Sequence, residues 1–179
     1  ANLNSISHNF WRDQCSSVMQ DGYIFNDTIA NNIALTDEKP DYTNLLNACN
    51  VANIMPFIEQ LPLGFNTKIG AEGNGISQGQ KQRILIARAV YKNPHFVFFD
   101  EATNALDANN EKVILENLQQ FFINKTVVIV AHRLSTVKNA DNIVVLQNGE
   151  IVEEGTHEIL SNKKGYYYEL VKNQLELGN

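Results

Sequence analysis

Two short apolar runs dominate the hydropathy pattern, and both predict strands of a parallel sheet. The first run is Phe96–Phe99 and the second is Thr126–Val130. A short apolar run without polar alternation is typical of a strand that is buried on both faces. Between the runs, apolar side chains recur at helical spacing, at Ile114, Leu118, Phe121 and Phe122. A strand, a helix and a second strand in this order predict a right-handed parallel crossover.

Two further helices are predicted before the first strand. Asp41 is placed to cap a helix that carries apolar side chains on one face, at Leu45, Cys49 and Ala52. A second helix is expected to begin near Ser77 and to stop at Asn93-Pro94, because proline disfavours helical backbone in the residue before it.

The end of the chain predicts a hairpin and a helix. Two apolar stretches, 143–146 and 151–152, flank Asn148-Gly149, a pair that favours a type I′ turn. The last residues predict a helix with Tyr166, Leu170 and Gln174 on one face.

Together these elements predict an α/β fold, with a parallel sheet flanked by helices and an inserted α-helical subdomain. Proline and glycine gather before Ser77, at Pro62, Gly64, Gly70, Gly73 and Gly75, which predicts a loop-rich approach to the helix that follows. We therefore divide the chain into residues 1–22, a helical subdomain over 23–75, and residues 76–179.

Two adjacent carboxylates, Asp100 and Glu101, follow the first apolar strand directly. Open α/β sheets bind their ligands at the carboxyl ends of strands. One carboxylate there suits a hydrated Mg²⁺ ion, and the other suits the orientation of a water molecule. In isolation, the pair favours a solvated acidic turn after a core strand, and the surrounding motifs reverse that interpretation.

Five segments in series resemble the nucleotide-binding domain of ATP-binding cassette (ABC) transporters, and the resemblance covers nearly the whole chain. They match its Q-loop, signature motif, Walker B strand, D-loop and H-loop, at Val18–Asp21, Ile76–Arg83, Phe96–Glu101, Ala102–Asp107 and Ala131–Arg133. Among exporters, the segments Ser77-Gln78-Gly79-Gln80 and Asn104-Ala105-Leu106-Asp107 resemble those of bacterial peptide and bacteriocin exporters, some of which carry a peptidase domain. The resemblance implies a P-loop NTPase core that binds ATP and Mg²⁺.

The resemblance also implies roles for the residues at the strand ends. Asp100 and Gln20 are expected to hold Mg²⁺, and Gln20 also to contact the attacking water. Glu101 matches the catalytic glutamate, which acts as general base or orients the water. His132 matches the histidine that donates a hydrogen bond to the γ-phosphate. On composition alone, Gln20 is better explained as a polar loop residue, and a lone histidine after a strand, such as His132, as a surface residue.

The signature segment is expected to bind nucleotide through Ser77, Gln78, Gly79 and Gln80. In the family this segment contacts the γ-phosphate of ATP held by the opposite subunit, so that two domains sandwich two nucleotides. Ser77 also fits an ordinary helix N-cap, and both roles are compatible. Two residues depart from the usual motif, Ile76 for leucine and Gln78 for the first glycine.

Asp107 is expected at the subunit junction, among the nucleotide-binding residues, or as the N-cap of a helix over 108–122. Glu72 is expected to contact the transmembrane partner, in a segment that resembles an exporter loop. Three cations in the signature helix are expected to be exposed charges rather than ligands, at Lys81, Arg83 and Arg88.

A phosphate-binding loop of the form Gly-x-x-x-x-Gly-Lys-Ser/Thr does not occur in these 179 residues. The nearest spacing is Gly70 to Gly75, but Ile76 follows where the motif requires lysine. In the family this loop precedes the Q-loop, and only nineteen residues precede Gln20. We therefore expect a truncated P-loop NTPase core, which would be inactive in ATP hydrolysis by itself.

Net charge and the length of the apolar runs limit the kinds of partner that this chain can have. A net charge of −6 argues against a nucleic-acid surface, and apolar runs are far shorter than the ~20 residues of a membrane helix. The resemblance implies a head-to-tail second nucleotide-binding domain and a transmembrane domain as partners. It places the parent transporter's ATPase at the cytoplasmic face of the bacterial inner membrane, without direct contact to the transported peptide. Two alternatives remain: an ABC-type ATPase of DNA maintenance, and a non-enzymatic interaction fragment.

Overall fold

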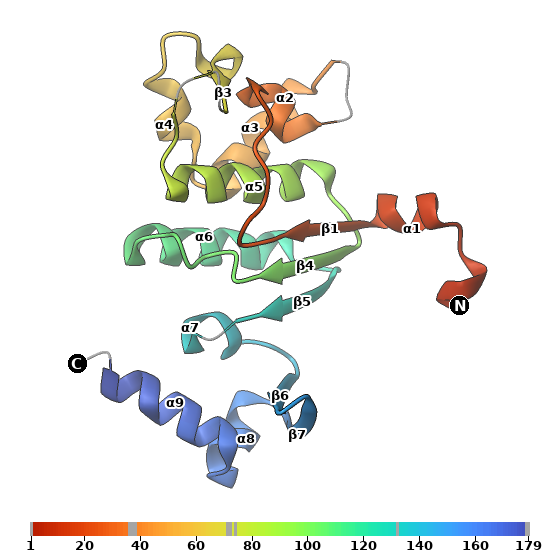
Figure 1. The fold of residues 1–179 in the computed structure, drawn as a ribbon, viewed down its shortest axis with the longest axis vertical. Helices are drawn as coiled ribbons and strands as arrows, with labels where there is room; N and C mark the ends of the chain where they lie inside the picture. Colours follow the sequence, from red (N-terminus) through yellow and green to blue (C-terminus); the bar gives the residue numbers. More distant parts are fainter. Residues whose placement is uncertain (1, 36–38, 71–72, 74, 132, 178–179) are drawn as a thin grey trace. The chain divides into compact units, whose positions relative to one another are not determined.

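The computed structural model describes residues 2–35, 39–70, 73, 75–131 and 133–177. The chain divides into two compact units, residues 1–130 and 131–179, which are described separately (Figure 1). The first unit contains the candidate site. Helices flank a parallel sheet there, which confirms the predicted α/β class.

A three-stranded parallel sheet lies at the centre of the first unit. Its strands are β1 (Cys15–Val18), β4 (Phe96–Asp100) and β5 (Thr126–Val130), in the order β1-β4-β5. Val18 pairs with Phe99, and Asp100 pairs with Val130, so the three carboxyl ends lie at one edge. The right-handed crossover rule therefore gave the correct partner for each predicted strand.

Burial along β4 differs from the expectation of a strand covered on both faces. Val97 and Phe99 are buried, whereas Phe98 is 36% exposed. On β5, Val128 and Val130 are also exposed. Successive side chains of a strand point to opposite faces, and among the described residues the helices bury one face of this sheet only. The prediction of a fully buried strand is therefore wrong for this structure.

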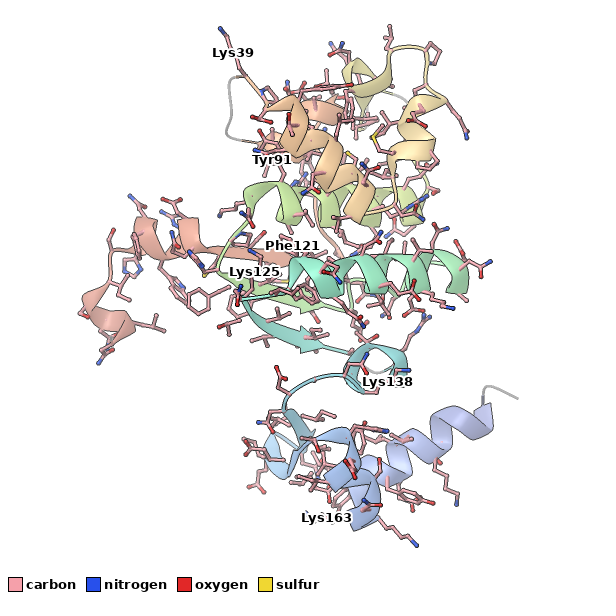
Figure 2. The ribbon with its side chains drawn as sticks, turned by 180° about the vertical axis from the view of Figure 1, so that it is seen from behind. Lys39, Tyr91, Phe121, Lys125, Lys138 and Lys163 are labelled. Carbon is pink, nitrogen blue, oxygen red and sulfur yellow. The ribbon has the colours of Figure 1, made fainter. Side chains whose placement is uncertain are left out.

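Two long helices pack on the sheet; the first contains most of the signature segment, and the second begins directly after the D-loop segment. They are α5 (Gln78–Lys92) and α6 (Ala108–Phe121). The predicted apolar stripe of α6 is confirmed, since Ile114 and Leu118 are buried in the same cluster as the buried side chains of β4. Lys125, just after α6, lies over the Phe121 ring at 4.7 Å and donates to the Pro94 carbonyl at 2.9 Å (Figure 2).

The remaining elements of the first unit are short, and most lie between residues 23 and 75. They are the 3₁₀ turns η1 (Leu3–Ser5) and η2 (Gly64–Asn66), the helices α1 (His8–Gln14), α2 (Ile29–Ala34), α3 (Tyr42–Val51) and α4 (Met55–Glu59), and the antiparallel pair β2 (Asp27–Thr28) and β3 (Lys68–Ile69). Asp41 caps α3, and the predicted buried face of that helix is confirmed at Leu45, Cys49 and Ala52. Burial raises the pKa of the Cys49 thiol to about 12.

One side chain fastens the segment that follows the Q-loop. Asn32 on α2 is fully buried. Its side chain accepts a hydrogen bond from the Phe25 backbone N–H and donates one to the Phe25 carbonyl. Tyr91 on α5 accepts a hydrogen bond from the Asp41 backbone N–H at 2.9 Å, at the start of α3 (Figure 2). Helices α2 and α3 are thereby joined to α5 by polar as well as apolar contacts.

The second unit contains α7 (Leu134–Val137), the hairpin β6 (Ile143–Gln147) and β7 (Glu150–Gly155), α8 (His157–Lys163) and α9 (Tyr166–Leu177). The hairpin is confirmed, and both turn residues, Asn148 and Gly149, have positive φ, as a type I′ turn requires. Glu153 is buried, accepts a hydrogen bond from the Tyr167 backbone N–H at 2.8 Å and lies 3.2 Å from the Lys163 ammonium (Figure 2).

The predicted C-terminal helix is confirmed as α9, and a different face of it is buried. Tyr166 and Leu170 are exposed, whereas Tyr167 and Val171 pack against the hairpin. Apolar residues stand at 166, 167, 170 and 171, so the sequence allows either face of the helix to be buried. The contact with the hairpin buries the face that carries Tyr167 and Val171. Within the described residues, no helix combines the length and apolar character needed to cross a lipid bilayer.

Candidate functional site

The candidate site lies at the carboxyl edge of the parallel sheet. Gln20 lies two residues beyond β1, and Asp100 ends β4, with Glu101 directly after it. Because the neighbouring strands are in register, these three predicted residues follow strand ends at the same edge. His132, two residues beyond β5, lies outside the described residues. Sequence spacing and the parallel topology therefore agree on where the candidate catalytic residues gather.

Glu101 has an unusual backbone conformation. Its φ is +49°, in the left-handed region that non-glycine residues seldom adopt. Its backbone N–H donates to the Val130 carbonyl at 3.0 Å, which fixes the turn to the end of β5. The Asn104 side-chain amide donates to the Glu101 carboxylate at 2.5 Å. Strained backbone of this kind gathers at functional sites, where the surrounding structure holds a side chain in a required position.

The chemistry of Asp100 and Gln20 fits Mg²⁺ bound together with phosphates. Both side chains are exposed at the sheet edge. Among the described residues, no three His, Cys, Asp or Glu side chains form a cluster able to hold a metal ion by themselves. Magnesium is commonly held by one or two protein oxygens, with phosphate oxygens and water as its other ligands. One carboxylate and one amide oxygen are sufficient for such a site.

The first turn of α5 contains the predicted signature residues. Ser77 is the N-cap, and its hydroxyl accepts a hydrogen bond from the Gln80 backbone N–H at 3.2 Å. In return, the Gln80 side chain accepts from the Ser77 backbone N–H at 2.8 Å, which completes a capping box. Ser77 and Gln78 are exposed. The N-cap interpretation of Ser77 is therefore observed, and the helix presents its N-terminal end to solvent.

Asp107 is the N-cap of α6, as one of its two interpretations proposed. Its carboxylate accepts hydrogen bonds from the Asn110 side chain at 2.5 Å and from the Asn110 backbone N–H at 3.0 Å. These two bonds, the side-chain bond foremost, hold the pKa of Asp107 below its ordinary value. The carboxylate is exposed and remains charged across the physiological range.

Arg83 and Arg88 differ from the expectation that they are exposed helix charges. Both are half-buried, and burial lowers the pKa of each guanidinium. Arg88 donates to the carbonyls of Asn32 at 2.8 Å and Tyr23 at 3.0 Å. Arg83 donates to the Asn53 carbonyl at 2.8 Å. These contacts join residues far apart in the sequence, so helical position alone did not reveal them. Lys81 is also half-buried.

One predicted contact residue cannot be placed. Glu72, expected to meet a transmembrane partner, lies outside the described residues. Gly70, two residues earlier, is described and has a φ of +106°, a conformation that favours glycine. An added Cβ at Gly70 would lie 2.9 Å from the Asn26 Cα atom.

The fold is a parallel α/β domain with candidate ligand-binding residues at the carboxyl edge of its sheet. A model of the ABC transporter family matches residues 1–104. The chain belongs to this family, which confirms the resemblance inferred from the five motifs.

Several curated relatives are similar over nearly the whole chain. The exotoxin translocation ATP-binding protein PaxB of Pasteurella aerogenes is 48% identical over 94% of this chain and 24% of its own length. The toxin RTX-III translocation ATP-binding protein of Actinobacillus pleuropneumoniae is 47% identical, again over 94% of this chain and 24% of its own. The leukotoxin translocation ATP-binding protein LktB of Mannheimia haemolytica is 46% identical over 93% and 24%.

A solved structure shows the same fold. A bacterial Atm1-family ABC exporter with ATP bound superposes with a TM-score of 0.91 at 37% identity, over 97% of this chain and 30% of that one. The chain spans about a quarter of the length of the curated relatives that it matches.

Proposed function

We propose that this chain is part of an ATP-hydrolysing domain that powers an ABC exporter, and that the exported substrate is a peptide or protein. The relatives are named as toxin translocation ATP-binding proteins, and the similar solved structure is an exporter with ATP bound. These names support export rather than DNA maintenance. We propose that the parent transporter lies in the bacterial inner membrane, with this domain on its cytoplasmic face.

One observation carries the proposal: the carboxyl edge of the sheet gathers Gln20, Asp100 and Glu101. The register of β1, β4 and β5 aligns the ends from which these residues follow. Hydrolysis of ATP requires a metal near the phosphates and an acceptor beside the attacking water. Two neighbouring carboxylates at this edge supply both needs with separate side chains.

Each residue has a distinct role in the proposed reaction. Bound Mg²⁺ neutralises charge on the phosphates, and Asp100 with Gln20 would hold it. Glu101 accepts the proton of the attacking water or orients that water, and Asn104 fixes the direction of its carboxylate. His132 would donate a hydrogen bond to the γ-phosphate, in line with its motif.

The signature segment acts on the nucleotide of a second domain. Free backbone N–H groups at a helix N-terminus favour phosphate. In the proposed head-to-tail dimer, Ser77, Gln78, Gly79 and Gln80 of one domain meet the γ-phosphate bound by the other, with Asp107 at the same junction. A transmembrane domain of the same transporter is the second partner, and the cargo does not contact these residues.

The experiment compares Glu101→Gln with Glu116→Gln in the full-length protein. The amide keeps the size of the Glu101 side chain but removes the proton acceptor, so turnover should fall by at least about 100-fold while ATP binding persists. Glu116 is exposed on α6, and the same change there should leave both quantities intact. Wild-type turnover of Glu101→Gln would refute the catalytic role of Glu101.

A further inference from the structure

The first turn of α5 and the segment before α6 approach each other closely. An added Cβ at Gly79 would lie 3.3 Å from the Ala105 carbonyl oxygen and 3.9 Å from a Leu106 methyl carbon. Apolar contact alone leaves such a pair free to slide, because it is not directional. A directional connection between the two segments is provided by polar side chains behind them.

Arg83 begins this connection on the α5 side. Its Nε atom donates to the Gly79 carbonyl at 3.4 Å, and one Nη atom donates to the Asn53 carbonyl at 2.8 Å. Asn53 ends the turn after α3, with a left-handed φ of +49°. The planar guanidinium thus ties the signature turn to a turn of the helical region.

Asn110 completes the connection on the α6 side. Its side-chain oxygen accepts from the Asn53 amide at 2.8 Å and from Arg83 at 3.5 Å. Its own amide donates to the Asp107 carboxylate at 2.5 Å. The chain of hydrogen bonds therefore runs without a break from Gly79 through Arg83 and Asn110 to Asp107.

We propose that Asn110 is a positioning residue that, with Arg83 and Asn53, holds the signature turn and Asp107 as one rigid surface for the partner's nucleotide. This inference rests on the proposed function, because it assigns both segments to the same dimer junction. A rigid surface loses less conformational freedom when it closes on a ligand, so its loss should weaken closure and not the first binding of nucleotide.

A matched control lies two turns further along the same helix. Asn117 lies seven residues after Asn110 on α6, and its amide donates to the carbonyls of Asn50 at 3.3 Å and Val51 at 3.2 Å. Both asparagines are half-buried and join α6 to the end of α3. Only Asn110 also contacts Asp107 and Arg83. A purely structural role predicts similar effects at both positions.

The experiment uses the full-length protein with Glu101→Gln, which should retain ATP in closed sites. We measure the ATP concentration for half-maximal occlusion by rapid gel filtration, and ADP binding by calorimetry. Asn110→Ala removes the hydrogen bonds to the Asp107 carboxylate, the Asn53 amide and the Arg83 guanidinium, so this ATP concentration should rise by about tenfold. ADP affinity should stay within about twofold, and Asn117→Ala should leave both values within about twofold.

A second variant tests the same connection if Asn110→Ala fails to fold. Asn53→Gly keeps the left-handed backbone and the carbonyl that Arg83 uses, but removes the amide donor to Asn110. It should shift occlusion in the same direction. In a double-mutant cycle, Arg83→Lys and Asn110→Ala together should raise the ATP concentration for half-maximal occlusion by less than the product of their separate fold-changes.

The possible outcomes distinguish failure of the proposed function from failure of the positioning role of Asn110. If the Glu101→Gln protein occludes no ATP, the proposed function fails and this inference fails with it. If that protein occludes ATP and Asn110→Ala behaves like Asn117→Ala, the inference alone is overturned. Additive effects of Arg83→Lys and Asn110→Ala would also overturn it.

Discussion

Asn32 gives the sharpest stability prediction, because among the described residues its buried amide bonds only to backbone and to Arg88. The side-chain oxygen accepts from the Phe25 N–H at 2.8 Å. The amide group donates to the carbonyls of Phe25 at 3.0 Å, Thr28 at 3.0 Å and Asp27 at 3.3 Å. Asn32→Ala removes all of these bonds and leaves the Phe25 N–H without its acceptor.

The expected cost follows from these contacts. A net hydrogen bond contributes about 1 kcal/mol, and the Asn32 side chain makes four such bonds with the backbone. The loss at Asn32 should therefore be about 3 kcal/mol. For a unit of this size, that corresponds to a fall of roughly 10 °C in the midpoint of thermal unfolding. Opening of the turn that follows the Q-loop should become about 100-fold more frequent.

Two measurements test this value. Thermal unfolding of the chain gives the midpoint, and hydrogen exchange at the Phe25 amide reports the turn itself. Asn31→Ala is the control, since the neighbouring Asn31 is exposed and its amide donates to the Asp27 carboxylate at 3.0 Å. That change should cost less than about 0.5 kcal/mol. Equal effects of the two substitutions would refute the reasoning.

Three further predictions concern separate parts of the molecule. The 179-residue chain alone should hydrolyse ATP negligibly, because its sequence contains no phosphate-binding loop, and robust Mg²⁺-dependent turnover of a pure sample would contradict this. Ser77→Arg in the full-length protein should abolish ATP occlusion while ADP binding persists; loss of an N-cap alone costs only ~1 kcal/mol, so persistent occlusion would reduce Ser77 to a cap. The Tyr167 N–H, and then Lys163, lower the pKa of Glu153, so its stabilising effect is complete above the ordinary value of 4.5 and is lost as pH falls through the folded value. Glu153→Gln should flatten the acid unfolding profile of the second unit, measured by near-ultraviolet circular dichroism, and identical profiles would count against this role.

Local signals in the sequence predicted the elements that carry the site. The capping residue Ser77 and the pair Asn93-Pro94 gave both ends of α5, because caps and prolines act within a few residues. The apolar runs gave β4 and β5, and the rule for parallel crossovers aligned their ends. The sequence therefore predicted that Asp100 and Glu101 lie at the carboxyl edge of the sheet, and the structure has them there.

Tertiary contacts explain what the sequence did not predict. The exposure of Phe98 depends on which helices cover the sheet, and a run of apolar residues carries no information about that cover. Arg83 and Arg88 bond to carbonyls of residues 30 and 56 positions away, a distance that helical periodicity does not address. The left-handed backbone of Glu101 follows from its bond to Val130, which depends on the strand register.

The most direct test of the central claim is a structure of the full-length Glu101→Gln protein with Mg²⁺ and ATP. We predict that the metal lies beside Asp100 and Gln20 at the carboxyl edge of the sheet. We also predict that the side chain at position 101 faces the γ-phosphate, and that Ser77 of the opposite domain meets the same phosphate. Nucleotide bound away from the ends of β1, β4 and β5 would contradict the proposed function.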